Sequence, residues 1–124
     1  MNIEEIRDFC LSLPGTTESF PFDETTLVFK VMGKMYCLMS LDGDPGVALK
    51  NLPDKILEMR EHYDCVIEAY HMNKVHWNTV MIDHPLPDAK LREWITDSYH
   101  LVISGLTRKL KEELKNLQQW LNLS

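Results

Sequence analysis

The chain has 124 residues, of which 44% are hydrophobic and 26% are charged. These values are those of a single globular domain, and no apolar run approaches the roughly 20 residues that a bilayer-spanning helix needs. The formal net charge of -6 disfavours non-specific attraction to nucleic acid. A secretory signal begins with basic residues and turns apolar, whereas Met1–Glu5 is acidic, so we expect a cytoplasmic protein.

The three cysteines, Cys10, Cys37 and Cys65, are widely spaced and form no CxxC pair. Each lies among apolar neighbours, where a free cysteine behaves as a small hydrophobic residue. We therefore expect reduced, buried thiols. A nucleophilic cysteine is the alternative, but the sequence places no histidine or acid beside one.

The N-terminal segment has the features of an amphipathic helix. Asn2 is a suitable N-cap, and Glu5 three residues later completes a capping-box pattern. Pro14 and Gly15 are expected to end the helix. Apolar residues recur at the spacing of one helical face: Ile6, Phe9, Cys10 and Leu13.

Three strands are predicted next. Alternating apolar residues indicate strands over Thr26 to Met32 and Met35 to Leu41, and Gly33 supplies the positive φ of a tight hairpin between them. The segment Thr16 to Glu24 contains a proline and is interpreted as an extended piece that reaches the edge of the sheet. Val47 to Lys50 follows a glycine-rich loop as a short third strand.

The second half begins with a helix, because Pro53 is suited to a first helical turn. Cys65 to Tyr70 and Trp77 to Asp83 are expected to be extended, with a bend or hairpin tip between them. Asp88 is placed to cap a further helix, in which apolar residues keep a helical spacing towards the C-terminus. The sequence leaves open whether Gly105 divides that region into two helices.

This order of elements predicts the fold class. It is α-β-β-β-α-β-β-α(-α), and the short connections favour an antiparallel sheet of about five strands with helices against one face. We expect a two-layer α+β fold that forms a single domain over residues 1–124.

The densest cluster of polar and aromatic groups is Tyr70 to Val80, which contains two histidines, two asparagines, a lysine and a tryptophan. The string His71 to Val80 resembles the corresponding motif of the MmcQ/YjbR family of small bacterial proteins. The resemblance extends over about residues 2–118. It also rests on these stretches: Leu13-Pro14-Gly15, Ser19-Phe20-Pro21-Phe22, Val31-Met32-Gly33-Lys34-Met35, Leu49-Lys50 and Ser98-Tyr99.

The resemblance implies a fold similar to bacterial frataxin (CyaY) and a family that is commonly labelled DNA-binding. It implies no enzymatic activity and no cofactor. One departure is Glu68, which stands where the family is expected to favour a proline. Its negative charge weakens a phosphate-contact interpretation of the nearby motif.

The residues predicted to contact nucleic acid or another ligand come from this motif and from flanking cations. Lys74 and Asn73 suit phosphates or a groove edge, and Trp77 suits stacking on an unpaired base. The alternative is that Trp77 lies in the core and that the asparagines stabilise turns. The full set of predicted contact residues is His71, Asn73, Lys74, His76, Trp77, Asn78, Lys34 and Lys50.

The sequence favours neither a metal site nor a catalytic site. His71 and His76 are five residues apart and converge only if a hairpin tip brings them together, and a third ligand would still be needed. Ser98, Tyr99 and His100 are adjacent on a helix and point in different directions. We expect a non-enzymatic protein whose partner is DNA.

A protein-interaction or chaperone-like module is the alternative. It would use the sheet edge or the surface of the motif. The sequence is compatible with a monomer or a weak homodimer.

Overall fold

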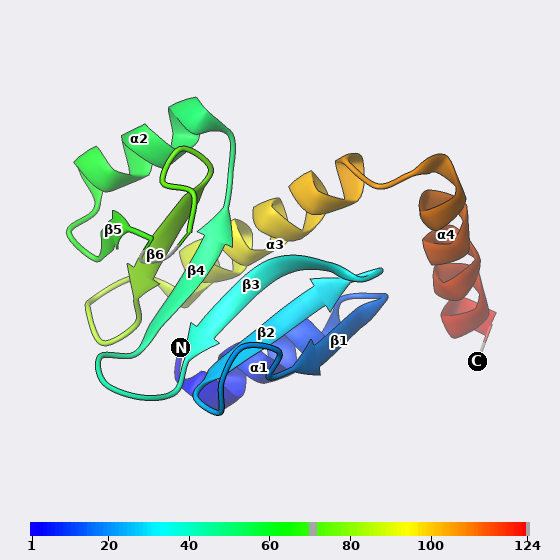
Figure 1. Cartoon of the computed structure of the whole chain (residues 1–124), viewed down its shortest axis with the longest axis horizontal. Coiled ribbons are helices and arrows are strands. Elements are labelled where there is room, and N and C mark those ends of the chain that lie inside the picture. The colour runs from blue at the N-terminus through cyan, green and yellow to red at the C-terminus, as the bar shows by residue number, and fades with distance from the viewer. Residues whose placement is uncertain (70–71, 124) are drawn as a thin grey trace.

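The computed structural model describes residues 1–69 and 72–123, and of residues 120–123 the backbone alone. Four helices and six strands follow one another in the chain (Figure 1). Their bounds are α1 Ile3–Ser12, β1 Thr16–Ser19, β2 Thr26–Val31, β3 Lys34–Ser40, β4 Gly46–Lys50, α2 Pro53–His62, β5 Val66–Glu68, β6 Trp77–Met81, α3 Asp88–Ser104 and α4 Arg108–Leu123.

The strands form one antiparallel sheet in the order β1-β2-β3-β4-β6-β5. The predicted α+β class with an antiparallel sheet is confirmed. The sheet has six strands rather than about five, because Thr16–Ser19 pairs with β2 as an edge strand. This edge strand consists of Thr, Thr, Glu and Ser, so no apolar alternation marks it in the sequence.

The two faces of the sheet are covered differently. One face carries the main core, in which Phe29, Met39 and Val47 pack against the helices. The other, which we call the open face, has a smaller cluster formed by Val28, Leu38, Ala69 and Trp77. The helices thus form a second layer on one side only (Figure 1).

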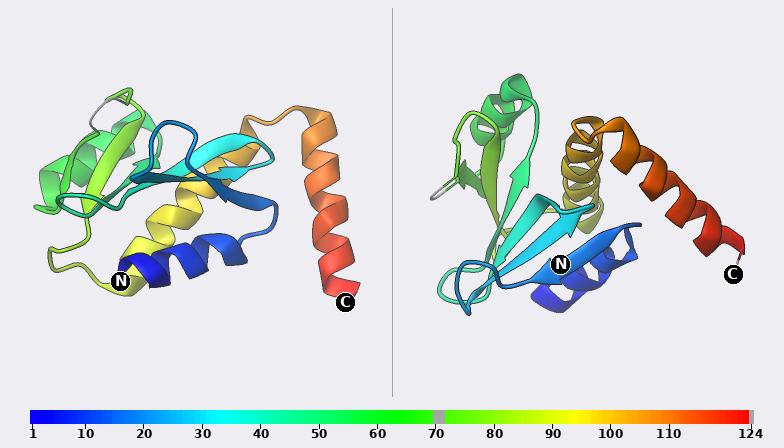
Figure 2. Two further views of the ribbon diagram at one scale, coloured as in Figure 1. Left: turned by 60° about the horizontal axis from the view of Figure 1, so that its bottom comes forward. Right: turned by 45° about the vertical axis from the view of Figure 1, so that its right-hand side comes forward.

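Strands β3 and β4 diverge, and this divides the sheet into two arms. Their paired register covers only Cys37 to Met39 of β3. Beyond it, β1, β2 and β3 form one arm and β4, β6 and β5 the other, while α3 contacts both arms (Figures 1 and 2). The buried hydroxyl of Ser98 lies at the fork, donating to the carbonyl oxygen of Tyr36 at 2.6 Å and accepting from the N–H of Lys50 at 2.9 Å.

Local signals at the N-terminal half act as predicted. The side chain of Asn2 accepts a hydrogen bond from the N–H of Glu5, and the carboxylate of Glu5 accepts one from the N–H of Asn2. Met32 and Gly33 connect β2 to β3 and both have a positive φ, at 50° and 84°. Two positive φ values are characteristic of the two-residue hairpin turn that matches the twist of the strands.

The C-terminal region consists of two helices, because α3 ends at Ser104 and Gly105 caps it. The following helix, α4, stands away from the sheet (Figure 2). Its Leu114 is buried against Gly15, where a Cβ atom would lie 2.7 Å from the Leu114 Cδ1 atom. Gly15 therefore has two reasons to be glycine, this contact and its φ of 76°.

Within the described part of the chain, no helix combines the length and the apolar character needed to cross a membrane.

Candidate functional site

The motif between β5 and β6 forms a tight turn organised by Asn73. Its side-chain oxygen accepts a hydrogen bond from the N–H of Val75 at 2.8 Å, and its carbonyl oxygen accepts one from Trp77 at 2.9 Å. This is the turn-forming role that asparagine performs well. His71, one of the predicted contact residues, lies outside the described residues.

Arg60 of α2 fixes the same turn from the side. Its guanidinium donates to the carbonyl oxygen of Lys74 and forms an ion pair with Glu68 at 3.3 Å. The carbonyl oxygen of His76, at the end of the turn, accepts a hydrogen bond from the N–H of Asn51 at 3.0 Å.

The Lys74 side chain is exposed, and its ammonium group donates a hydrogen bond to the carbonyl oxygen of Ala69 at 3.3 Å. Glu68 thus neutralises Arg60 and leaves Lys74 without an acidic partner among the described residues.

Trp77 lies in the interior rather than on the surface. Only 8% of it is exposed, because it packs with Ala69 and Leu38 on the open face, next to the half-buried Met72. The core alternative describes its position, and the ring is not presented for stacking on a base. Its contribution to the motif is structural.

Asn78 is fully buried on the opposite face of β6. Its amide donates to the carbonyl oxygen of Ile56 at 3.0 Å, which attaches α2 to the sheet. The side-chain oxygen has no partner among the described residues. This burial removes Asn78, like Trp77, from the contact surface predicted from the sequence.

The predicted cations share one end of the sheet. Lys34 begins β3 beside the hairpin turn, and Lys50 ends β4 opposite Trp77 of β6. Lys30 of β2 pairs with Met35 at the same end. In the described part of the chain, none of these three lysines forms an ion pair with a carboxylate.

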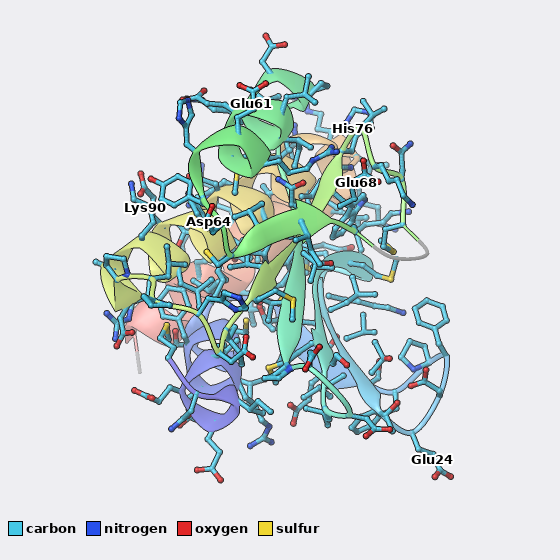
Figure 3. All side chains as sticks on the ribbon, turned by 90° about the vertical axis from the view of Figure 1, so that its left-hand side faces the viewer. Glu24, Glu61, Asp64, Glu68, His76 and Lys90 are labelled. Carbon is cyan, nitrogen blue, oxygen red and sulfur yellow. The ribbon has the colours of Figure 1, made fainter. Side chains whose placement is uncertain are left out.

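Acidic residues gather at the other end of the sheet. Asp23 and Glu24 lie in the loop between β1 and β2, and Asp42 and Asp44 lie in the loop between β3 and β4. Figure 3 shows Glu24 and His76 at opposite ends of the molecule. The net charge of -6 is therefore unevenly distributed along the sheet, with lysines on the two diverging arms and carboxylates where the arms meet.

No catalytic arrangement forms among the residues considered from the sequence. The Ser98 hydroxyl is buried and bonded to backbone groups, and the Tyr99 hydroxyl donates to the carbonyl oxygen of Pro14. Burial raises the pKa of the Tyr99 phenol. Within residues 1–69 and 72–123, no three His, Cys, Asp or Glu side chains are grouped so as to hold a metal ion.

A concave region lies between α2 and α3 and has a volume of about 530 Å³. Its lining includes charged residues of both signs, among them Lys55, Lys90, Glu93 and Asp97. Asp97 is exposed at this groove, and partial desolvation there, followed by the nearby Glu93 carboxylate, raises the pKa of Asp97. This mixture of charges gives the groove no preference for one sign of ligand.

Comparison with known proteins decides the family. The sequence model of the YjbR family matches residues 11–101. This chain belongs to the YjbR family. The resemblance to MmcQ/YjbR proteins predicted from the sequence is thereby confirmed.

Two bacterial relatives illustrate the similarity. The protein YbdF of Escherichia coli O157:H7 is 35% identical over 113 residues, which cover 90% of this chain and 93% of YbdF. The protein YjbR of Escherichia coli strain K12 is 28% identical over 118 residues, which cover 94% of this chain and all of YjbR. Both are described as uncharacterized proteins, so the similarity supports family membership but indicates no activity.

Solved structures show the same fold. The Deinococcus radiodurans protein DR2400 superimposes with a TM-score of 0.84 at 37% identity, covering 92% of this chain and 88% of that protein. A crystal structure of a Pseudomonas syringae protein gives a TM-score of 0.72 at 28% identity, covering 82% of this chain and 98% of that protein. This chain and the two solved proteins thus share one α+β fold.

Two residues that organise the site were not singled out for these roles from the sequence. Arg60 lies on a helix 14 residues before the carbonyl group that it binds. Ser98 is 48 residues from Lys50. Both contacts join residues that are distant in the sequence, so no local pattern in the sequence predicts them.

Proposed function

We propose that this YjbR-family protein binds DNA without catalysing a reaction, as a cytoplasmic bacterial protein. The observation that supports this function is the segregation of charge along the sheet. Lys30, Lys34, Lys50 and Lys74 lie on the two arms at the diverging end and have no acidic partner within the described residues. Phosphate contacts by such lysines dominate the affinity of most DNA-binding proteins.

The binding is expected to be independent of sequence, with the clustered lysines offsetting locally the net charge of -6 that disfavours such binding. Trp77 and Asn78 are buried, so the motif offers few groups for reading base edges. The lysines would contact the phosphate backbone, which positions a protein on DNA but carries no sequence information. The acidic end of the sheet would point away from the DNA, because carboxylates there repel phosphates.

The test is a titration of a short DNA duplex at ~50 and ~200 mM salt. Four phosphate contacts give a slope of about -3.6 for log affinity against log salt, or a loss of roughly 100-fold between these concentrations. The double variant Lys34→Ala/Lys50→Ala should lower the magnitude of the slope by about two.

A matched control is Lys109→Ala/Lys111→Ala on the exposed surface of α4. Both double variants remove two positive charges and change the net charge from -6 to -8. The control should retain the wild-type slope. Equal losses in both variants, or no binding at ~50 mM salt, would reject the proposal and favour partner binding at the β5 edge, where Ile67 is exposed.

A further inference from the structure

A cleft opens on the open face at the acidic end of the sheet. Its volume is about 550 Å³, within the range of roughly 300–1,000 Å³ that small-molecule sites occupy. The floor is formed by three neighbouring strands, through Leu38 of β3, Ala48 of β4 and Thr79 of β6. These residues lie side by side in the register, so the floor is part of the rigid sheet.

The walls come from segments that are distant in the sequence. Phe22 and Asp23 belong to the loop between β1 and β2, and Asp44 belongs to the loop between β3 and β4. Met72, from the segment before β6, completes the opposite side. The cleft therefore exists only in the folded protein, and both arms of the sheet contribute to it.

The charge of the lining has one sign. Asp23 and Asp44 contribute two carboxylates, and none of the described lining residues is Lys, Arg or His. Asp23 accepts hydrogen bonds from the N–H groups of Thr25 and Thr26 at 2.9 and 2.7 Å. These hydrogen bonds hold the pKa of Asp23 below its ordinary value, and the one from Thr25 has the largest effect. The Asp44 side chain is exposed at the opening and forms no ion pair with the described residues.

An aromatic ring lies beside these carboxylates. Phe22 is 64% exposed although it lines the cleft, so much of its ring is available to a bound molecule. The face of an aromatic ring attracts cations, by about 0.5–1 kcal/mol at exposed sites. The hydroxyl groups of Thr26, Ser40 and Thr79 add hydrogen-bonding partners to the lining.

We propose that this cleft binds a small organic cation with an apolar body, such as a primary amine attached to an aromatic or aliphatic group. The apolar part would lie over Leu38 and Ala48 and against Phe22. The positive charge would lie near Asp44 and Asp23. This site is separate from the lysines of the proposed DNA surface, because none of the four lysines lines the cleft and its two carboxylates lie at the acidic end of the sheet.

The probes are three molecules with the same phenyl-ethyl skeleton and different charges: phenethylamine, 2-phenylethanol and 3-phenylpropionate. Each is added to ¹⁵N-labelled full-length protein, and the backbone amide shifts are followed by NMR. The amine should shift the amides of Ala48 and Thr79 with a Kd in the millimolar range or tighter. The alcohol should bind more weakly, and the carboxylate should not bind.

Two pairs of variants separate charge from ring contact. Asp44→Asn should weaken amine binding about fivefold, whereas Asp42→Asn in the same loop should leave it unchanged, because Asp42 does not line the cleft. Phe22→Ala should weaken it about threefold. Phe20→Ala is the matched control, since Phe20 is 49% exposed in the same loop and also lies outside the lining.

Two results would overturn this proposal. One is the absence of amide shifts at Ala48 and Thr79 with ~10 mM phenethylamine. The other is equal binding of the three probes, which would show that the carboxylates do not select the ligand. Neither result affects the DNA titration, because its variants change lysines that do not line the cleft.

Discussion

Ser98 of α3 supplies the backbone N–H of Lys50 with the hydrogen-bond acceptor that a neighbouring strand would otherwise provide. The same hydroxyl donates to the carbonyl oxygen of Tyr36, on the other arm. One buried side chain thus satisfies a backbone group from each of two strands at the point where they separate. A buried backbone group without a partner costs free energy comparable to a lost hydrogen bond.

Replacement of Ser98 by alanine should destabilise the protein by about 3 kcal/mol. Two backbone groups lose a partner at once, and each unsatisfied buried group costs about 1–3 kcal/mol. Urea unfolding followed by circular dichroism measures this change as a lower midpoint at unchanged slope. Ser104→Ala is the matched control, because Ser104 is exposed on the same helix and, among the described residues, its hydroxyl bonds only to the carbonyl oxygen of Leu101.

Replacement of Trp77 by alanine should cost about 4 kcal/mol, the usual penalty for removing a large aromatic side chain from a core. Val75→Ala, two residues earlier, should change stability by less than about 0.5 kcal/mol, because Val75 is 56% exposed. Trp77→Phe should leave the affinity for DNA unchanged in the titration. A selective loss of DNA affinity in that variant, at full stability, would show that the indole ring contacts the ligand.

Asp97 should make the protein less stable at neutral pH than it would be with a neutral side chain. Partial desolvation of its exposed carboxyl raises its pKa above the ordinary value of 3.8, so the folded protein binds the proton more readily than the unfolded chain does. The destabilisation is present where the carboxylate is ionised, and it fades as the pH falls through the raised pKa towards 3.8.

The variant Asp97→Asn should therefore raise the Tm at pH ~7 by a small amount and should lose this advantage at pH ~3.5. Differential scanning calorimetry across this range gives the comparison. Asp54→Asn should have the opposite sign at neutral pH, because an acid in the first turn of α2 is favoured by the helix dipole. A constant Tm difference for Asp97→Asn at all pH values would contradict the titration argument.

Local sequence signals predicted most of the fold. The capping box at Asn2, the hairpin at Gly33 and the alternation in β2 and β3 all depend on residues within a few positions of one another. The segment that contains β1 was predicted to be extended and to reach the sheet edge, but it was not counted as a strand, because its four polar residues show no alternation and pair only with β2. An edge strand of this kind has no buried face to reveal it.

The candidate site was harder to predict, because contact and structural roles use the same residue types. Exposure of Lys34 and Lys74 agrees with their prediction as contact residues, and their binding remains a prediction. The polar side chain of Asn78 suggested a surface position, but its amide group donates a hydrogen bond to a carbonyl oxygen of α2 that is 22 residues away in the sequence. The sequence does not distinguish a core Trp77 from a stacking Trp77, because the residues that cover the ring, Ala69 and Met72, are brought to it by the fold.

The ladder between β3 and β4 ends at Cys37 and Leu49, so the distance between the tips of the two arms depends on α3 rather than on the sheet. In the proposed complex with DNA, that distance would decide which pairs of phosphates Lys34 and Lys50 could contact together. A repacking substitution at Ile95 or Tyr99, both buried on α3, would change the width of the fork without touching any lysine. The distance between the lysines at the tips of the two arms would then be set by the packing of α3 in the interior.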